Sequence, residues 1–414
     1  MSARVISRVR RKRRSPREWA GRVALACGAA VLGYHSVVFS VAQVAAGTAP
    51  TLADRLASYD GRLLAVHAGA LITPGASVAA RAEAEALARG ALHLDPTAVV
   101  AAATLGLAAA TQGKATEARR FLAYAQMLSR RNAQIQLWSI EDAVTRDDVA
   151  GALRWYDVAL RTNPSLGDVL YPVLAQAARD PAIRSELVRT LVGKPIWADS
   201  YINYAVQQRD DPRSTALLFL ELRKRGVAVS ESARAAVVNA LLESGHADEA
   251  WRYYATLRLG ADRRRARDPR FTVTPATASL FDWLPINDGN VSASIQRARD
   301  GGAFEFSAPA TIGGAVLQQV ELLPPGMYHL TGHSNGIAQE TGALPYWALS
   351  CRSDGRELGR VTLPNSSQAD GMFAGLLTVP SNCSVQALTL FAPPSDATGG
   401  TSGQIDRVAL VPAR

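Results

Sequence analysis

The feature that most constrains this chain is an uncharged stretch of twenty-five residues that follows a strongly basic tail. Residues 23–47 contain no Asp, Glu, Lys or Arg, whereas residues 1–22 carry nine Arg or Lys and a single acid, Glu18. A helix that rises about 1.5 Å per residue crosses a hydrocarbon core of roughly 30 Å with about twenty residues. Positive charge clustered on one side of a span holds that side in the cytoplasm. We therefore expect a basic cytoplasmic tail over 1–22 and a transmembrane helix over 23–47.

Two other interpretations of this segment stay open. Ala42 or Ala46 could end the small-residue cleavage site of a signal peptide. The stretch could also be the buried helix of a soluble domain, but the basic flank would then have no purpose. Because the apolar stretch is longer than an ordinary signal core, we favour an uncleaved anchor. Both export interpretations place the remainder outside the cytoplasm, and we expect a single-pass bacterial inner-membrane protein with its bulk in the periplasm.

The charge balance excludes one class of partner. The chain has a formal net charge of +9, and the tail contributes +8 (nine bases, one acid), which leaves +1 for all other residues. A nucleic-acid-binding domain normally carries its basic charge on the folded surface. We therefore expect no nucleic-acid partner and assign the tail to the inner membrane.

The cysteines fit an exported domain. Cys27 lies in the span, and Cys351 and Cys383 are the only others. In an oxidising compartment two such cysteines form a natural pair, so a Cys351–Cys383 disulfide is predicted. Two unrelated buried thiols are the alternative.

Composition divides the exported part in two. Residues 51–260 are rich in Ala and Leu with helical periodicity, whereas residues 270–414 are richer in Gly, Pro, Ser, Thr and Val, with short alternating runs. Residues 261–269 between them begin ADRRRARD and predict a charged, solvated linker. The predicted architecture is multidomain α + β: a transmembrane helix, an α-helical domain and a β domain.

The helical part contains an internal repeat. Ala84, Ala88, Ala91 and Pro96 are spaced by four, three and five residues, and Ala152, Tyr156, Ala159 and Pro164 have the same spacing. Midway, thirty-four residues from each set, lie Ala118, Leu122 and Ala125. A later pair, Ala250 and Tyr254, stands thirty-four residues after Ala216 and Leu220.

This pattern resembles the tetratricopeptide repeat (TPR), in which a small residue lies where two helices of a hairpin touch and a Pro ends the second helix. The resemblance implies a solenoid of helical hairpins with a concave surface for a protein partner. Residues 165–197, with three prolines, interrupt the spacing and predict a shortened or broken repeat. An ordinary Ala-rich bundle is the alternative. The positions expected at repeat packing contacts are Ala84, Ala91, Ala118, Ala125, Ala152, Tyr156, Ala159, Ala250 and Tyr254.

The C-terminal part predicts an antiparallel β-sandwich. Eight candidate strands lie between Gly- and Pro-containing turns: 303–306, 315–322, 327–332, 347–351, 359–363, 373–379, 385–391 and 405–411, after a start at Phe271-Thr-Val-Thr. The runs PPGMYHLTGHS and GQIDRVALVP resemble strands of jelly-roll carbohydrate-binding modules. That resemblance implies a jelly-roll-like sandwich and a possible glycan ligand.

We find no motif for catalysis, cofactor or metal. Nucleotide loops and a nucleophile elbow are absent, and the carboxylates are scattered, although a glycosidase pair would be spatial and leave no motif. His329 and His333 share a strand face, but further ligands are lacking apart from Glu340 or Asp406. No catalytic residue, no metal and no cofactor is therefore assigned.

Two aromatic residues are weak candidates for glycan contact. Tyr346 points to the opposite side of its predicted strand from Trp347, which shares a face with Leu349 and Cys351. We therefore expect Trp347 in the core and Tyr346 at the surface, and leave Trp283 as a second candidate.

The expected function is that of a non-enzymatic, membrane-anchored periplasmic scaffold. The architecture resembles tetratricopeptide proteins of exopolysaccharide or cell-envelope assembly. The resemblance implies a protein partner on the repeat surface, with a polysaccharide as an additional candidate partner. The main alternative is a carbohydrate-binding or glycan-modifying protein that acts through the β domain. A third is a cytoplasmic adaptor that uses the basic tail.

Overall fold

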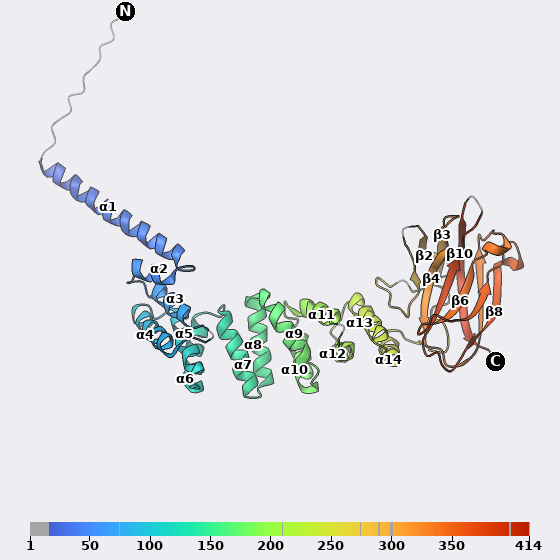
Figure 1. The fold of residues 1–414 in the computed structure, drawn as a ribbon, viewed down its shortest axis with the longest axis horizontal. Helices are drawn as coiled ribbons and strands as arrows, with labels where there is room; N and C mark the ends of the chain where they lie inside the picture. The colour runs from blue at the N-terminus through green and yellow to red at the C-terminus, as the bar shows by residue number, and fades with distance from the viewer. Residues whose placement is uncertain are drawn as a thin grey trace, which may run out of the picture. The chain divides into compact units, whose positions relative to one another are not determined.

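The computed structural model describes residues 16–73, 75–208, 210–273, 275–288, 290–298, 301–396 and 399–413. Most of the predicted basic tail lies outside the described residues. The chain divides into two compact units, residues 1–164 and residues 165–414. Figure 1 shows the order of the helices and strands along the chain.

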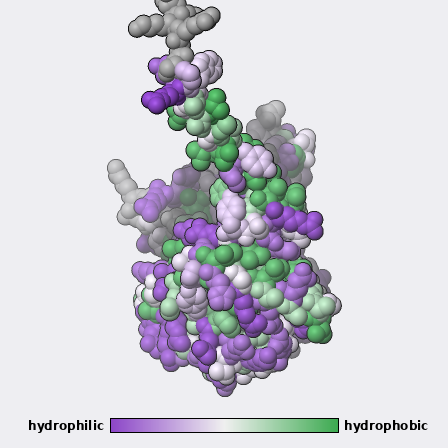
Figure 2. Space-filling view, turned by 90° about the vertical axis from the view of Figure 1, so that its left-hand side faces the viewer, coloured by the Kyte–Doolittle hydropathy of each residue, from purple (hydrophilic) through white to green (hydrophobic). Residues whose placement is uncertain are grey.

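The first unit begins with α1 (Pro16–Ala45), a helix long and apolar enough to cross a membrane. Hydrophobic residues run along α1, with hydrophilic residues at its N-terminal end (Figure 2). Its one buried residue is Ala42, near the C-terminal end, so nearly the whole helix lacks a protein neighbour within the described chain.

Three helical hairpins follow a short helix, α2 (Pro50–Leu56). They pair α3 (Gly61–Leu71) with α4 (Val78–Leu94), α5 (Val99–Thr111) with α6 (Ala115–Leu128), and α7 (Ala133–Thr145) with α8 (Val149–Thr162). The second hairpin shows why small residues recur. A Cβ at Gly106 would lie 2.5 Å from Cγ of Leu122, so glycine lets α5 approach α6.

The second unit begins with six more helices. They are α9 (Gly167–Ala177), α10 (Pro181–Val192), α11 (Ala198–Gln207), α12 (Pro212–Lys224), α13 (Glu231–Glu243) and α14 (Ala247–Leu257), with the short η1 (Pro164–Leu166) before them. Residues 165–197 contain the helices α9 and α10 although their prolines interrupt the repeat spacing. Pro172 lies inside α9, and Pro181 opens α10, where its missing N–H costs no hydrogen bond.

A sandwich of two five-stranded antiparallel sheets completes the second unit, which confirms the predicted fold class. One sheet has the order β1-β4-β9-β6-β7 and the other β2-β3-β10-β5-β8. The strands are β1 (Leu284–Pro285), β2 (Ser292–Ala298), β3 (Gly301–Ala308), β4 (Gly314–Glu321), β5 (Gly326–Asn335), β6 (Tyr346–Cys351), β7 (Glu357–Thr362), β8 (Met372–Val379), β9 (Gln386–Ala392) and β10 (Thr401–Pro412). Two short 3₁₀ helices, η2 (Thr341–Ala343) and η3 (Ala369–Gly371), lie in its loops.

The predicted strands match these closely, with two differences. All eight candidates overlap observed strands, but β1 and β2 were not predicted. The expected first strand at Phe271 is wrong. Phe271 has φ +52°, outside the extended region, and its ring is buried in the core instead.

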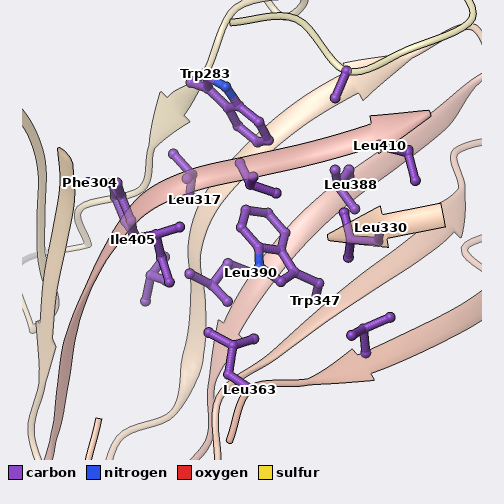
Figure 3. Close-up of a cluster of buried hydrophobic side chains, with 14 of the residues drawn as sticks. Trp283, Phe304, Leu317, Leu330, Trp347, Leu363, Leu388, Leu390, Ile405 and Leu410 are labelled. Carbon is purple, nitrogen blue, oxygen red and sulfur yellow. The ribbon is translucent and has the colours of Figure 1, made fainter. Parts of the chain in front are cut away.

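The sandwich core lies between the sheets and is filled by large side chains from both (Figure 3). Trp347 of β6 is fully buried there, as predicted. At one end, Cys351 and Cys383 form the predicted disulfide, with 5.8 Å between their Cα atoms. Cys351 ends β6, and Cys383 lies in the loop before β9, so the bond ties two neighbouring strands of one sheet.

The segment between helices and sandwich is not a solvated linker along its whole length, which corrects that prediction. Arg263, Arg264 and Arg265 are half-buried or exposed, but Ala266 and Arg267 are buried. The Arg267 guanidinium donates to Glu321, at 2.6 Å, and to the carbonyl of Phe281, at 2.8 Å. A buried guanidinium is tolerated because a carboxylate and carbonyl oxygens surround it.

The last repeat helix packs directly on the sandwich through aromatic residues. Trp251 and Tyr254 of α14 contact the ring of Phe281, with centroids 5.4 and 5.2 Å apart. The Tyr254 hydroxyl donates to Asp282 at 2.9 Å. Helix α14 therefore shares a buried interface with the segment that leads into β1.

Candidate functional site

The residues predicted at repeat packing contacts are all buried. Each lies on the second helix of a hairpin, α4, α6, α8 or α14. These residues are Ala84, Ala91, Ala118, Ala125, Ala152, Tyr156, Ala159, Ala250 and Tyr254. They hold the scaffold together and are not themselves accessible to a partner.

A second set of residues follows the same thirty-four-residue spacing on the first helix of each hairpin. Val66, Val100 and Gln134 form one row across α3, α5 and α7, and Gly69, Ala103 and Leu137 form the next. Because equivalent positions of stacked repeats lie side by side, the rows cross the surface made by the first helices. We call this surface the groove; its residues are Val66, Gly69, Val100, Ala103, Leu107, Gln134 and Leu137.

Two adjoining cavities mark the groove. One, of about 390 Å³, is lined by six of the groove residues, all except Leu137, and also by Ala46, Gly47 and Pro50 of the α1–α2 turn. The other, of about 530 Å³, shares Val66 and Val100 with it and extends to Arg62 and Leu128. The shared lining, Val66 and Val100, is aliphatic, and the first cavity adds the amides of Asn132 and Gln134. The groove therefore suits apolar side chains of a ligand whose polar backbone meets these amides.

On α7 the apolar character of the surface continues beyond the cavities. Leu137 is 37% exposed and Val144 is 63% exposed. Val144 stands thirty-four residues after Ala110. Glu141, which lies between Leu137 and Val144 in the sequence, stands thirty-four residues after Leu107. The exposed aliphatic residues of α7 beyond the cavities are therefore separated by a charged side chain.

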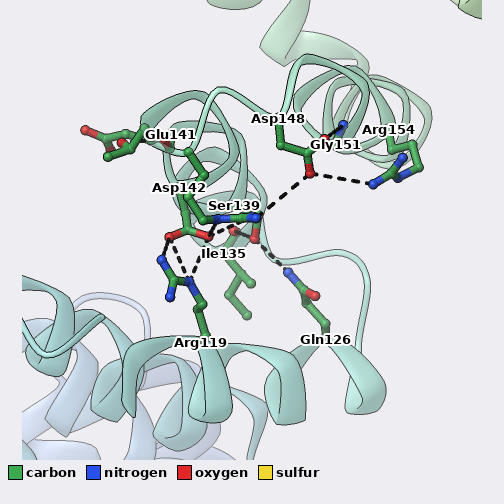
Figure 4. Close-up of polar contacts among 11 residues, drawn as sticks. Arg119, Gln126, Ile135, Ser139, Glu141, Asp142, Asp148, Gly151 and Arg154 are labelled. Carbon is green, nitrogen blue, oxygen red and sulfur yellow. Dashed lines mark hydrogen bonds and ion pairs between the residues drawn. The ribbon is translucent and has the colours of Figure 1, made fainter. Parts of the chain in front are cut away.

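A polar network fixes the third hairpin against the second (Figure 4). Arg119 of α6 donates to Asp142 of α7 at 2.9 Å, and this contact lowers the pKa of Asp142. Gln126 of α6 donates to Ser139 at 2.8 Å, while the Asp148 side chain accepts from the amide of Gly151 to start α8. Glu141 points away from this network. The contacts set the position of α7, and hence of Leu137, relative to α5.

Neither candidate for glycan contact presents a free aromatic face. Trp283, which the sequence left as a second candidate, is 4% exposed, and its indole N–H donates to the carbonyl of Asp268 in the interior. Tyr346 is half-buried on the outer side of its sheet, as predicted. Arg360 of β7 lies 3.8 Å from the centroid of the Tyr346 ring, and Phe391 of β9 stacks at 5.3 Å. Since β7 and β9 flank β6, the two neighbours cover opposite faces of the ring.

The histidine pair of β5 lies on the outer face of its sheet. His329 is exposed, and His333 is half-buried with Nδ1 at 2.8 Å from a carboxylate oxygen of Asp406. Within the described residues, no group of three or more His, Cys, Asp or Glu side chains is arranged to hold a metal ion.

Sequence reasoning found the packing residues of the repeats but missed the groove. The signal was present, because the same thirty-four-residue count applied to the first helices pairs Val66 with Val100 and Ala103 with Leu137. These positions attract less notice because their residue types differ from repeat to repeat, whereas seven of the nine packing positions are alanine.

The comparisons with known proteins report likeness in structure only. No protein-family model and no curated protein matches the chain. Similar solved structures include YrrB, described as a TPR protein with an unusual peptide-binding site. YrrB is 17% identical to this chain, and the match covers 49% of this chain and 98% of YrrB, with a TM-score of 0.28. A CBM4 carbohydrate-binding module is 16% identical over 36% of this chain and 99% of its own, with a TM-score of 0.27. The family 11 module from Clostridium thermocellum, in complex with a mixed-linked tetrasaccharide, is 13% identical over 32% and 89%, with a TM-score of 0.20.

Proposed function

We propose that this protein is a non-enzymatic, membrane-anchored scaffold of the bacterial envelope that binds a segment of another protein in the groove. The observation that carries the proposal is a pair of adjoining cavities that share the aliphatic residues Val66 and Val100, at repeat positions of α3 and α5. The protein segment would place aliphatic or aromatic side chains against Val66, Val100 and Leu107. Backbone amides of the segment would meet the amides of Asn132 and Gln134 at the rim.

Export supports a periplasmic position for the groove. Helix α1 is long and apolar enough to serve as an anchor, and the Cys351–Cys383 bond suits an oxidising compartment. With the basic residues before α1 in the cytoplasm, everything after α1 would lie on the periplasmic side.

The β-sandwich would provide a second contact, to protein or to an envelope polysaccharide such as an exopolysaccharide. The rings of Trp283 and Tyr346 do not support sugar stacking, because one is buried and the other is covered on both faces. A polysaccharide contact would therefore use polar side chains on the outer sheet faces, and the protein-binding role has the stronger support.

Site-specific photo-crosslinking in the native envelope tests the proposal. A photoreactive amino acid replaces Leu137 at the edge of the groove, and the matched control carries it at Met127, which is 80% exposed on α6. We expect one discrete crosslinked protein from position 137 and none from position 127, with loss of the product when Leu107→Glu places a charge in the groove. Equal crosslinking from both positions, or a product insensitive to Leu107→Glu, would contradict a specific groove.

A further inference from the structure

The turn after α1 folds the chain back along the end of that helix. Ala42 of α1 is buried in one cluster with Ala53 and Ala57 of the α2 segment and with Leu63 of α3. Next to it, the Gln43 side chain donates to Asp60 at 3.2 Å. These contacts hold residues 57–60 beside Ala42 and Gln43, at one position along the axis of α1.

That point coincides with the expected exit from a bilayer. The uncharged stretch starts at residue 23, and about twenty helical residues cross a core of roughly 30 Å, which ends the hydrocarbon near Ala42. Measured from Trp19, the level of Gln43 lies roughly 36 Å along the helix at about 1.5 Å per residue. This length is greater than the thickness of the hydrocarbon core and smaller than the thickness of the full bilayer. Trp19 and Gln43 would therefore lie at the two opposite membrane–water interfaces.

Large exposed side chains stand at this level. Tyr59, adjacent to Asp60, is 60% exposed, and Leu52 of α2 is 49% exposed. Trp19 is also exposed, at the other end of α1. Tyrosine and tryptophan concentrate at membrane interfaces, because their rings enter the apolar region while the polar atom stays hydrated.

We propose that Leu52 and Tyr59 form a second membrane contact that holds the first repeat against the lipid surface next to α1. The proposal rests on the membrane anchoring of α1 described above. It explains why residues in a short connecting segment expose a leucine and a tyrosine while the alanines between them are buried. It also sets the place of the groove, since Ala46, Gly47 and Pro50 of the same turn line one of its cavities. The groove would then open at headgroup level and receive protein segments that run close to the bilayer.

Fluorescence quenching by lipid-borne spin labels tests this contact in the full chain. The exposed Cys27 is first removed as Cys27→Ser. Single labelling sites are then introduced as Leu52→Cys, Tyr59→Cys, Leu32→Cys in the middle of α1, and Met127→Cys on α6. Each labelled protein is reconstituted into vesicles of phosphatidylethanolamine and phosphatidylglycerol that carry the quencher either near the headgroup or deep in the acyl chain.

We expect deep quenching at position 32, headgroup-level quenching at 52 and 59, and quenching at 127 at least fivefold weaker than at 59. Quenching at 52 and 59 no stronger than at 127, with position 32 still deeply quenched, would overturn the second contact and leave the anchor intact. Absence of quenching at position 32 would overturn the anchor itself and the contact with it.

Discussion

The guanidinium of Arg267 lies 2.6 Å from a carboxylate oxygen of Glu321, and both side chains are buried where α14 meets the sandwich. The two residues stand 54 positions apart, one in the segment that leaves the repeats and the other at the end of β4. Arg267 also lies over the rings of Trp251 and Phe281, at 5.4 and 5.5 Å. This pair therefore joins the segment that follows α14 to the β domain.

Burial raises the pKa of Glu321 to about 7 from 4.5, although Arg267 beside it acts in the opposite direction. A carboxyl whose folded pKa exceeds its unfolded value stabilises the fold fully below pH 4.5, and this contribution is lost as the pH rises through about 7. We expect protection of residues 262–285 from hydrogen exchange, corrected for intrinsic rate, to fall between pH 5 and 8 by an amount on the order of 3 kcal/mol at most. Glu321→Gln, which cannot ionise, should remove the trend. An unchanged slope in that variant would show that another group is responsible.

Small residues at the repeat contacts should tolerate no enlargement. Ala118 of α6 is fully buried, so Ala118→Leu overpacks the hairpin and should cost about 1–3 kcal/mol. Ala123→Leu, on the exposed side of the same helix, is the matched control and should change the free energy of unfolding by less than about 0.5 kcal/mol. Urea denaturation of the detergent-solubilised chain, followed by circular dichroism, measures both. Equal effects would argue against tight packing at position 118.

The disulfide should stabilise the sandwich. It closes a loop with a sequence separation of 32 residues, for which the chain-entropy model gives about 3–4 kcal/mol. We expect Cys351→Ala/Cys383→Ala to lower the unfolding midpoint followed by tryptophan fluorescence, and peptide mapping without reductant to recover the linked peptides. Free thiols at both positions in protein from the envelope would contradict the bond and weaken the case for export.

The orientation of the chain can be tested independently. Alkaline phosphatase fused after residue 60 should be active, because α1 would have carried the junction across the membrane. A reporter that matures only in the cytoplasm should be silent at the same place. The reverse pattern would place the repeats in the cytoplasm and remove the basis for an oxidising environment.

The sequence predicted the regular parts of this fold because local patterns encode them. Alternating apolar residues marked strands such as β5 and β9, and recurrent alanines marked the hairpins. Strand β2 was missed because its sequence, SASIQRA, is small and polar with one large aliphatic residue. The burial of Arg267 could not be predicted, since nothing near it in sequence reveals Glu321 as its partner. The stacking of Phe391 on the Tyr346 ring could not be predicted either, because Phe391 comes from another strand, β9.

The groove is the central element of this account, and a direct affinity measurement tests it most sharply. The segment recovered by crosslinking from position 137 is synthesised as a peptide and titrated calorimetrically into the full-length chain in detergent. We predict that Leu137→Glu weakens binding at least tenfold, because a charge replaces an aliphatic side chain that the bound segment would cover, whereas Met127→Glu leaves the affinity unchanged. Equal affinity of wild type and Leu137→Glu would contradict binding in the groove.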